Sequence, residues 1–206
     1  MRIAVLWQSM SGYFSASLRA LADVPGVELC LAFRSAQPQA PFDQANFDWI
    51  NPQYSWDQKP SVTRLDGLLA DFDPDAVLVS SWHIGGYRAA LRHLRRQATR
   101  VLCMDKQWLA RLASRQDIRP FFDVACVLGD RPLAFGNRLG FRESHVLRGL
   151  YFADTELFRL QADDPHSPDF AFLFVGRLIE LKKRARGTQA PNEHAVQHRP
   201  LISLPG

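Results

Sequence analysis

The stretch DPDAVLVSSWHIGGYRAALRHLRRQ, residues 73–97, contains one complete strand–loop–helix unit. It opens on an Asp-Pro-Asp triplet, which is typical of a turn. Residues 76–79 are apolar without alternation, which predicts a strand buried on both faces of a parallel sheet. Residues 86–97 have helical periodicity and predict an amphipathic helix. The stretch therefore predicts a β-strand that leads directly into an α-helix.

The same alternation continues on both sides of this stretch. Apolar runs predict strands at 3–7, 27–33, 100–104 and 122–128, and another within SHVLRGLY at 144–151. Helical periodicity predicts helices at 13–22, 61–72 with Ser61 as its N-cap, 106–115, and from 130 to about 140. Residues 34–60, rich in aromatic residues and proline, are expected to be an irregular insertion. About five or six such units in series predict an α/β fold with a doubly wound, Rossmann-like parallel sheet.

A segment rich in Asp and Pro, 159–169, predicts a linker between two domains. Residues 1–158 are expected to form the Rossmann-like domain, and residues 170–182 to form the first strand and loop of a second domain. Residues 183–206 show neither helical nor strand periodicity, and we expect an irregular tail and an incomplete second domain.

The charge distribution argues against a nucleic-acid partner. The chain has 25 basic and 21 acidic residues, a formal net charge of +4. Residues 183–206 contain four of the basic residues and one acidic residue, so the rest of the chain is almost neutral. The three cysteines lie in apolar runs without metal-ligand spacing, which predicts reduced, buried thiols and a cytoplasmic protein. We also expect no signal peptide and no membrane span.

In an open parallel sheet, ligands bind where the strands end at their carboxyl ends. His83 follows the predicted strand 76–79, and the pair Gly85 and Gly86 comes directly after it. A neutral imidazole there can accept a proton or bond a sugar hydroxyl. It can equally cap the sheet edge, but the two glycines favour a functional role because they let a ligand approach the backbone.

Other loops after strands give weaker candidates. Gly12, with Ser11 and Tyr13 beside it, follows the first strand and can bring backbone N–H groups to an anion. Lys106 follows the strand at 100–104 and can line a cleft. Residues 71–75, DFDPD, contain two D-x-D spacings, but they lie at the opposite edge of the sheet and are interpreted as a turn. We predict no metal site.

The helix at 86–97 also carries a basic stripe. Its members are Arg88, Arg92, Arg95 and Arg96. A solvated helix face is the favoured interpretation, and peripheral contact with the inner face of an anionic membrane is the alternative.

The stretch FLFVGRLIELKK, residues 172–183, has the pattern of a buried strand, a glycine turn and a basic loop. Arg177 and Lys182 could both reach one diphosphate if the loop folds back. Together with RIAVLW and with FDVACVLGDRPLAFGNRLGF…HVLRGLYFADTELF, this stretch resembles the family-4 glycosyltransferases, which have the two-domain GT-B architecture. The resemblance covers roughly residues 1–182.

The resemblance implies a retaining sugar transfer from a nucleotide sugar to a sugar or lipid-linked acceptor, with no cofactor. His83 would be the cleft histidine, Gly12 would approach a phosphate, and Arg177 and Lys182 would hold the donor diphosphate. Ser11, Tyr13, Gly85, Gly86 and Lys106 would lie on the acceptor side of the cleft. Lys183 stands where the family usually has Gly, and the irregular sequence after it leads us to expect a truncated chain with little or no transferase activity.

Two alternatives stay open. The chain could be a non-catalytic acceptor-binding module or half of a split enzyme, with the aromatic residues at 42–56 stacking on sugar rings. It could also be an α/β enzyme that uses NAD, but the first strand is not followed by the pattern GxGxxG.

Overall fold

The computed structural model describes residues 1–37, 42–94, 98–104, 118–127, 134 and 136–149. The chain divides into two units, Met1–Asp164 and Pro165–Gly206, and all the described residues belong to the first. The domain boundary near 158, the linker 159–169, the strand predicted at 170–175 and the tail 183–206 lie outside the described residues. The helix predicted at 106–115 lies outside them as well.

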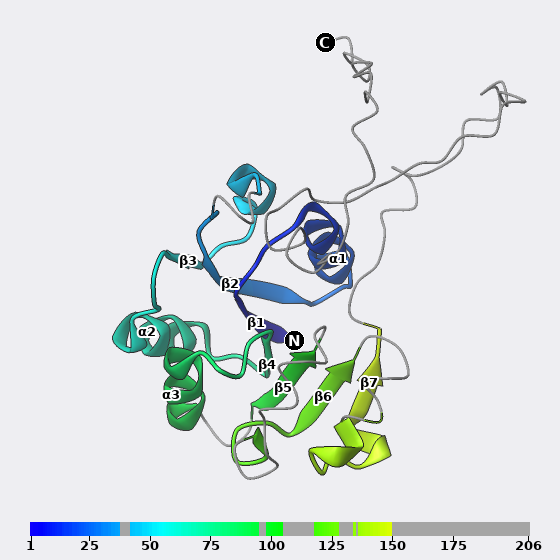
Figure 1. Ribbon diagram of the computed structural model, residues 1–206. Coiled ribbons are helices and arrows are strands. Elements are labelled where there is room, and N and C mark those ends of the chain that lie inside the picture. The colour runs from blue at the N-terminus through cyan, green and yellow to red at the C-terminus, as the bar shows by residue number, and fades with distance from the viewer. Residues whose placement is uncertain (38–41, 95–97, 105–117, 128–133, 135, 150–206) are drawn as a thin grey trace, which may run out of the picture. The chain divides into compact units, whose positions relative to one another are not determined.

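The described strands form one seven-stranded sheet in which every neighbouring pair is parallel (Figure 1). The strands are β1 (Arg2–Trp7), β2 (Glu28–Arg34), β3 (Gln53–Trp56), β4 (Ala76–Val79), β5 (Thr99–Met104), β6 (Val124–Val127) and β7 (Val146–Arg148). Their spatial order is β3-β2-β1-β4-β5-β6-β7, so the direction of winding reverses between β1 and β4. The predicted α/β fold with a doubly wound, Rossmann-like sheet is confirmed.

Helices cover both faces of this sheet. Helix α1 (Gly12–Ala22) and the 3₁₀ helix η1 (Gln44–Phe47) pack on one face, while α2 (Val62–Phe72) and α3 (Gly85–His93) pack on the other. A short 3₁₀ helix, η3 (Glu143–His145), leads into β7. The strands supply both cores by alternation, since Ala4 and Leu6 of β1 face α2 and α3, whereas Ile3, Val5 and Trp7 face α1.

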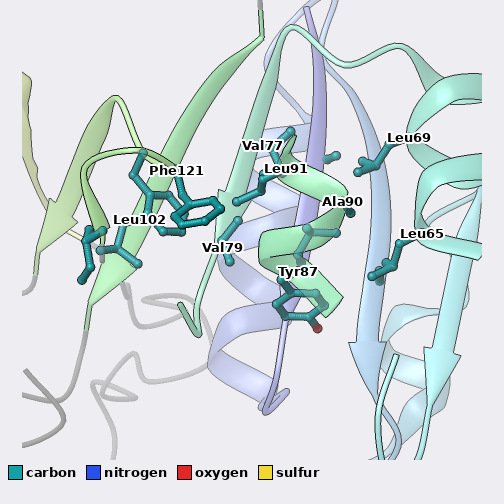
Figure 2. Close-up of a cluster of buried hydrophobic side chains, with 14 of the residues drawn as sticks. Leu65, Leu69, Val77, Val79, Tyr87, Ala90, Leu91, Leu102 and Phe121 are labelled. Carbon is teal, nitrogen blue, oxygen red and sulfur yellow. The ribbon is translucent and has the colours of Figure 1, made fainter. Parts of the chain in front are cut away.

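The core beneath α2 and α3 combines aliphatic and aromatic side chains. Leu65 and Leu69 of α2 and Leu91 of α3 belong to the same buried cluster as Val77 and Val79 of β4 (Figure 2). Each such side chain contributes roughly 1.5–3 kcal/mol by leaving water. This packing fixes α3, and therefore the loop before it, against the middle of the sheet.

The prediction of an irregular insertion at 34–60 was wrong. This segment contains η1 and the edge strand β3, which pairs with β2 from Leu31–Gln53 to Arg34–Trp56. Strand β3 escaped prediction because it has only four residues, QYSW, in which two polar residues alternate with two buried aromatic ones. Most of the aromatic side chains at 42–56 fill the core rather than form a stacking loop, and Phe47 and Tyr54 are buried.

Most predicted boundaries agree with the structure within two residues, but the helix predicted at 86–97 is shorter. It begins at Gly85 and ends at His93, because Leu94 adopts an extended conformation, φ −64° and ψ 144°. Leu94 packs against the core in this conformation, so tertiary packing overrides the helical periodicity. Arg88 and Arg92 of α3 both lie over the ring of Phe121, at 5.9 and 4.9 Å from its centroid. These two members of the basic stripe therefore pack on the protein itself.

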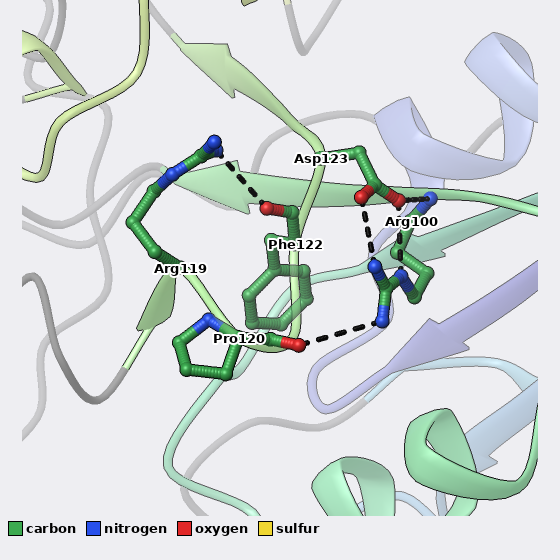
Figure 3. A network of polar contacts seen from close by, with 5 residues as sticks. All are labelled: Arg100, Arg119, Pro120, Phe122 and Asp123. Atoms are coloured by element: carbon green, nitrogen blue, oxygen red, sulfur yellow. Dashed lines mark hydrogen bonds and ion pairs between the residues drawn. The ribbon is translucent and has the colours of Figure 1, made fainter. Parts of the chain in front are cut away.

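Two aspartates form hydrogen bonds at the amino edge of the sheet. The carboxylate of Asp75, just before β4, accepts a hydrogen bond from the backbone N–H of Arg2 at 2.7 Å. Asp123, just before β6, accepts from the backbone N–H of Arg100 at 2.9 Å. Asp123 also binds the Arg100 guanidinium through both carboxylate oxygens, at 2.9 and 2.8 Å (Figure 3). Asp75, the last aspartate of DFDPD, therefore has a structural role, in agreement with the interpretation of this stretch as a turn.

The three cysteines are free thiols, and two of them, Cys30 and Cys103, are buried. Burial raises the pKa of Cys30 to about 12, so this thiol stays protonated. The prediction of reduced cysteines packed as small apolar residues is confirmed for these two. Cys126 is only half-buried, and its Sγ donates to the carbonyl oxygen of Gly149 at 3.3 Å.

The Asp123–Arg100 pair predicts a pH-dependent contribution to stability. Desolvation raises the pKa of Asp123, but the hydrogen bonds from Arg100 outweigh it and hold the pKa below its ordinary value. A lowered native pKa adds stability above the unfolded pKa of about 3.9 and loses it as the pH falls through the native value. We expect Asp123→Asn to lower the free energy of unfolding at pH 7 by about 1 kcal/mol, since the pair is partly exposed.

Urea denaturation at pH 7 and at pH 3 measures this effect, and the difference between wild type and variant should shrink at the lower pH. Glu28→Gln is the matched control, because Glu28 is an exposed carboxylate that makes one ion pair with Arg2 at 3.4 Å. It should cost less than about 0.5 kcal/mol. Equal losses for the two variants would contradict the role given to Asp123.

Candidate functional site

A pocket of about 580 Å³ lies at the carboxyl edge of the sheet, on the side where the winding reverses. The first four strands deliver residues to it, since Gln8 follows β1, Arg34 ends β2, Trp56 ends β3 and His83 follows β4. The described residues that line it are Gln8, Arg34, Trp56, Gln58, Lys59, Pro60, Ser61, Val62, His83, Ile84, Gly85 and Gly86. This is the edge at which open α/β sheets bind their ligands.

Two serines after β4 fix the side chain of Gln8. The Gln8 backbone N–H donates to the Ser80 hydroxyl at 2.9 Å, and the hydroxyl of the buried Ser81 donates to Gln8 Oε1 at 2.7 Å. Oε1 accepts this one bond, so Gln8 can offer a ligand the two N–H donors of Nε2 and the second lone pair of Oε1. Among the described residues, Nε2 has no hydrogen-bond partner.

A buried hydrogen-bond relay holds three walls of the pocket together. Trp56 Nε1 donates to the Tyr87 hydroxyl at 3.2 Å, and that hydroxyl donates to the carbonyl oxygen of Trp7 at 3.1 Å. Tyr87 is fully buried on the first turns of α3. Burial raises the pKa of Tyr87 well above its usual range, so the hydroxyl stays protonated and keeps its donor. The relay thus ties α3 to the ends of β1 and β3.

The start of α3 forms one side of the pocket. Its N-cap, Ile84, supplies no side-chain hydrogen bond to the helix. The backbone N–H groups of Gly85 and Gly86 have no partner among the described residues, so they are available to an anion or to a hydroxyl oxygen. His83 is exposed beside them, with its ring perpendicular to that of Trp82 at 6.1 Å.

Two basic residues, Arg34 and Lys59, also line the pocket. The Arg34 Nε donates to the carbonyl oxygen of Asp57 at 2.8 Å, and its Nη2 lies 3.4 Å from Gln37 Oε1. Its guanidinium also sits 5.9 Å from the centroid of the Trp56 indole. Lys59 lies on the same loop as Asp57 and is exposed. Among the described residues that line the pocket none is acidic, so none of them compensates the charges of Arg34 and Lys59.

The structure brings together three of the predicted site residues, His83, Gly85 and Gly86. Ser11, Gly12 and Tyr13 lie at the start of α1, where Ser11 is the N-cap, and they do not line this pocket. A Cβ atom added to Gly12 would meet nothing within 4 Å, so the structure leaves room for a ligand there. Lys106, Arg177 and Lys182 lie outside the described residues.

Sequence reasoning missed Gln8, Arg34, Trp56 and Lys59. Gln8 and Arg34 stand directly at the ends of predicted strands, so inspecting every strand end could have found them. Trp56 and Lys59 could not be found this way, because β3 was interpreted as irregular.

No known family model matches the chain, and no curated protein matches it. Within the described part of the chain, no cluster of three His, Cys, Asp or Glu side chains could hold a metal ion. None of the described helices has the length and apolar character needed to cross a membrane. The pocket lining is therefore the basis for a functional proposal.

Gly86 should not tolerate a side chain, because it packs closely against Pro60, and Gly85 is the matched control. A Cβ atom at Gly86 would lie 2.8 Å from Pro60 Cγ and 3.2 Å from the Pro60 carbonyl oxygen, whereas one at Gly85 would meet nothing within 4 Å. We expect Gly86→Ala to destabilise the protein by about 1–3 kcal/mol through overpacking. Gly85→Ala should be neutral or stabilising by up to about 1 kcal/mol, as alanine favours a helix. Thermal melting compares them, and equal effects would contradict this close contact.

The relay through Tyr87 predicts strong coupling between Tyr87 and Trp56. Tyr87→Phe leaves the Trp7 carbonyl oxygen and Trp56 Nε1 without their partner, and should cost about 1–3 kcal/mol. In a double-mutant cycle with Trp56→Phe, the double variant should lose less free energy of unfolding than the two single variants lose together, by at least about 0.5 kcal/mol. Denaturant unfolding of the four proteins measures this, and simple additivity would exclude the relay.

Proposed function

We propose that this domain is the acceptor-binding half of a glycosyltransferase that moves a sugar from a nucleotide sugar to a sugar or lipid-linked acceptor. The observation that carries the proposal is the pocket at the carboxyl edge of the sheet, where His83, Gly85 and Gly86 meet the amide of Gln8. These groups suit a polyol, since imidazole, amide and backbone N–H groups all bond hydroxyl oxygens. The resemblance to family-4 glycosyltransferases in sequence motifs supports the same assignment.

His83 is the proposed catalytic residue of the transfer. It is exposed at the pocket, beside the unpartnered N–H groups of α3, where it can bond a hydroxyl of the transferred sugar or of the acceptor. Arg177 and Lys182 are the proposed ligands of the donor diphosphate, whose leaving charge they would stabilise. Transfer requires these donor-side groups together with the acceptor-side groups.

A non-catalytic acceptor-binding module is the second candidate. Twelve described residues line the pocket, and they lie between positions 8 and 86. The groups that these residues offer to an acceptor come from this stretch alone, so an acceptor could bind them without transfer taking place.

Titration of the whole chain with neutral mono- and disaccharides tests the binding half of the proposal. We expect saturable changes in the ¹⁵N–¹H spectrum at Gln8, Gly85 and Gly86, and none at His145, which lies in η3 beside the far strand of the sheet. Changes spread over the whole surface, or none at any sugar, would contradict the proposal.

Release of nucleoside diphosphate from a panel of nucleotide sugars then separates the two candidates. For a transferase, His83→Ala should lower acceptor-dependent release by about a hundredfold or more, while His145→Ala should leave it unchanged. Release that depends on the acceptor and on His83 would exclude the non-catalytic module, even at the low activity expected of this chain.

A further inference from the structure

The pocket contains more positive charge than a neutral sugar requires. Arg34 and Lys59 line it, and no aspartate or glutamate stands with them in the described part of the lining. Among the described residues, neither cation takes part in an ion pair. Ordering a long basic side chain costs conformational entropy, yet hydrogen bonds hold the side chain of Arg34 in one orientation.

The fixing of Arg34 uses neutral partners only. Its Nε is bonded to the backbone carbonyl oxygen of Asp57 and its Nη2 faces the side-chain oxygen of Gln37. These contacts orient the guanidinium and leave its charge unneutralised, and Nη1 has no partner in the described part of the chain. Arginine held in this manner can bind an oxyanion without the entropic cost of ordering the side chain.

Further donors line the same pocket. The N–H groups of Gly85 and Gly86 are unpartnered among the described residues, and the close contact between Gly86 and Pro60 holds the loop of Lys59 beside them. Two cations and two backbone donors are more than the two oxygens and single charge of a carboxylate can use. They match a phosphate monoester, which has three acceptor oxygens and a charge of about −1.5 to −2 at pH 7.

We propose that the acceptor carries a phosphoryl group, and that Arg34 and Lys59 bind it in this pocket. The inference rests on the proposed function in taking the ligand to be a glycosyl acceptor. The phosphoryl group can belong to a soluble sugar phosphate or to a lipid monophosphate, because both are monoesters and present the same three terminal oxygens.

Isothermal titration of the whole chain at constant ionic strength tests the proposal with four probes, namely glucose, glucose 1-phosphate, inorganic phosphate and farnesyl phosphate. We expect glucose 1-phosphate to bind at least roughly tenfold more tightly than glucose, as hydrogen bonds to a charged group contribute that much. Arg34→Gln and Lys59→Gln should each lower the affinity for glucose 1-phosphate by roughly five- to tenfold and leave the affinity for glucose unchanged.

Matched variants separate charge from folding. Arg142→Gln removes one exposed positive charge just before η3 and should have no effect on any probe. Arg34→Lys keeps the charge and should retain part of the preference for the phosphate. Lys59→Gln changes an exposed side chain that makes no hydrogen bond or ion pair within the described part of the chain. Thermal melting of each variant shows whether it remains folded.

The outcomes distinguish this inference from the function on which it rests. Equal affinity for glucose and glucose 1-phosphate, with signals at the pocket, would overturn the phosphoryl proposal and leave the acceptor site standing. Binding of phosphate without any contribution from sugar would keep the anion site and overturn the glycosyl acceptor. Tighter binding of farnesyl phosphate than of glucose 1-phosphate would assign the phosphoryl group to a lipid carrier, and the reverse would assign it to a soluble sugar.

Discussion

The hydrogen bonds through the hydroxyl of Tyr87 set the geometry on which the pocket depends. One side chain joins α3 to Trp7 at the end of β1 and to Trp56 at the end of β3. At the carboxyl ends of these strands, the Tyr87 hydroxyl adds its hydrogen bonds to those of the strand ladder and to those that join Gln8 to the two serines after β4. Because Tyr87 lies one residue after Gly86, the same contacts that satisfy buried polar atoms also place the donors of the helix start.

The two edges of the sheet have opposite electrostatic character. At the amino edge, Asp75 and Asp123 cap the N–H groups of Arg2 and Arg100, so acidic side chains there serve folding. At the carboxyl edge, the described residues of the pocket lining include Arg34 and Lys59 and no carboxylate. Stability and ligand binding are thus assigned to different ends of the same strands, and residues at one edge can change without weakening the other.

Much of this fold could be predicted from sequence, since buried parallel strands are continuous apolar runs and the helices between them keep their periodicity. The strand at 76–79 was predicted with its observed limits. β3 could not be predicted, because a four-residue edge strand is stabilised by pairing with β2 rather than by its own pattern. His83, Gly85 and Gly86 were found from their place after β4. Lys59 was not, because its position at the pocket depends on β3 and on the contact between Pro60 and Gly86.

The sheet separates two cores that share no buried residue, one beneath α1 and one beneath α2 and α3. Tyr87 and Trp56 belong to the second, which supports the pocket. The hydrogen bond from the Tyr87 hydroxyl to the carbonyl oxygen of Trp7, a residue of the first core, crosses between them. A substitution that changes the volume of the second core can therefore be compensated by neighbours on its own face, provided that it leaves this crossing contact in place.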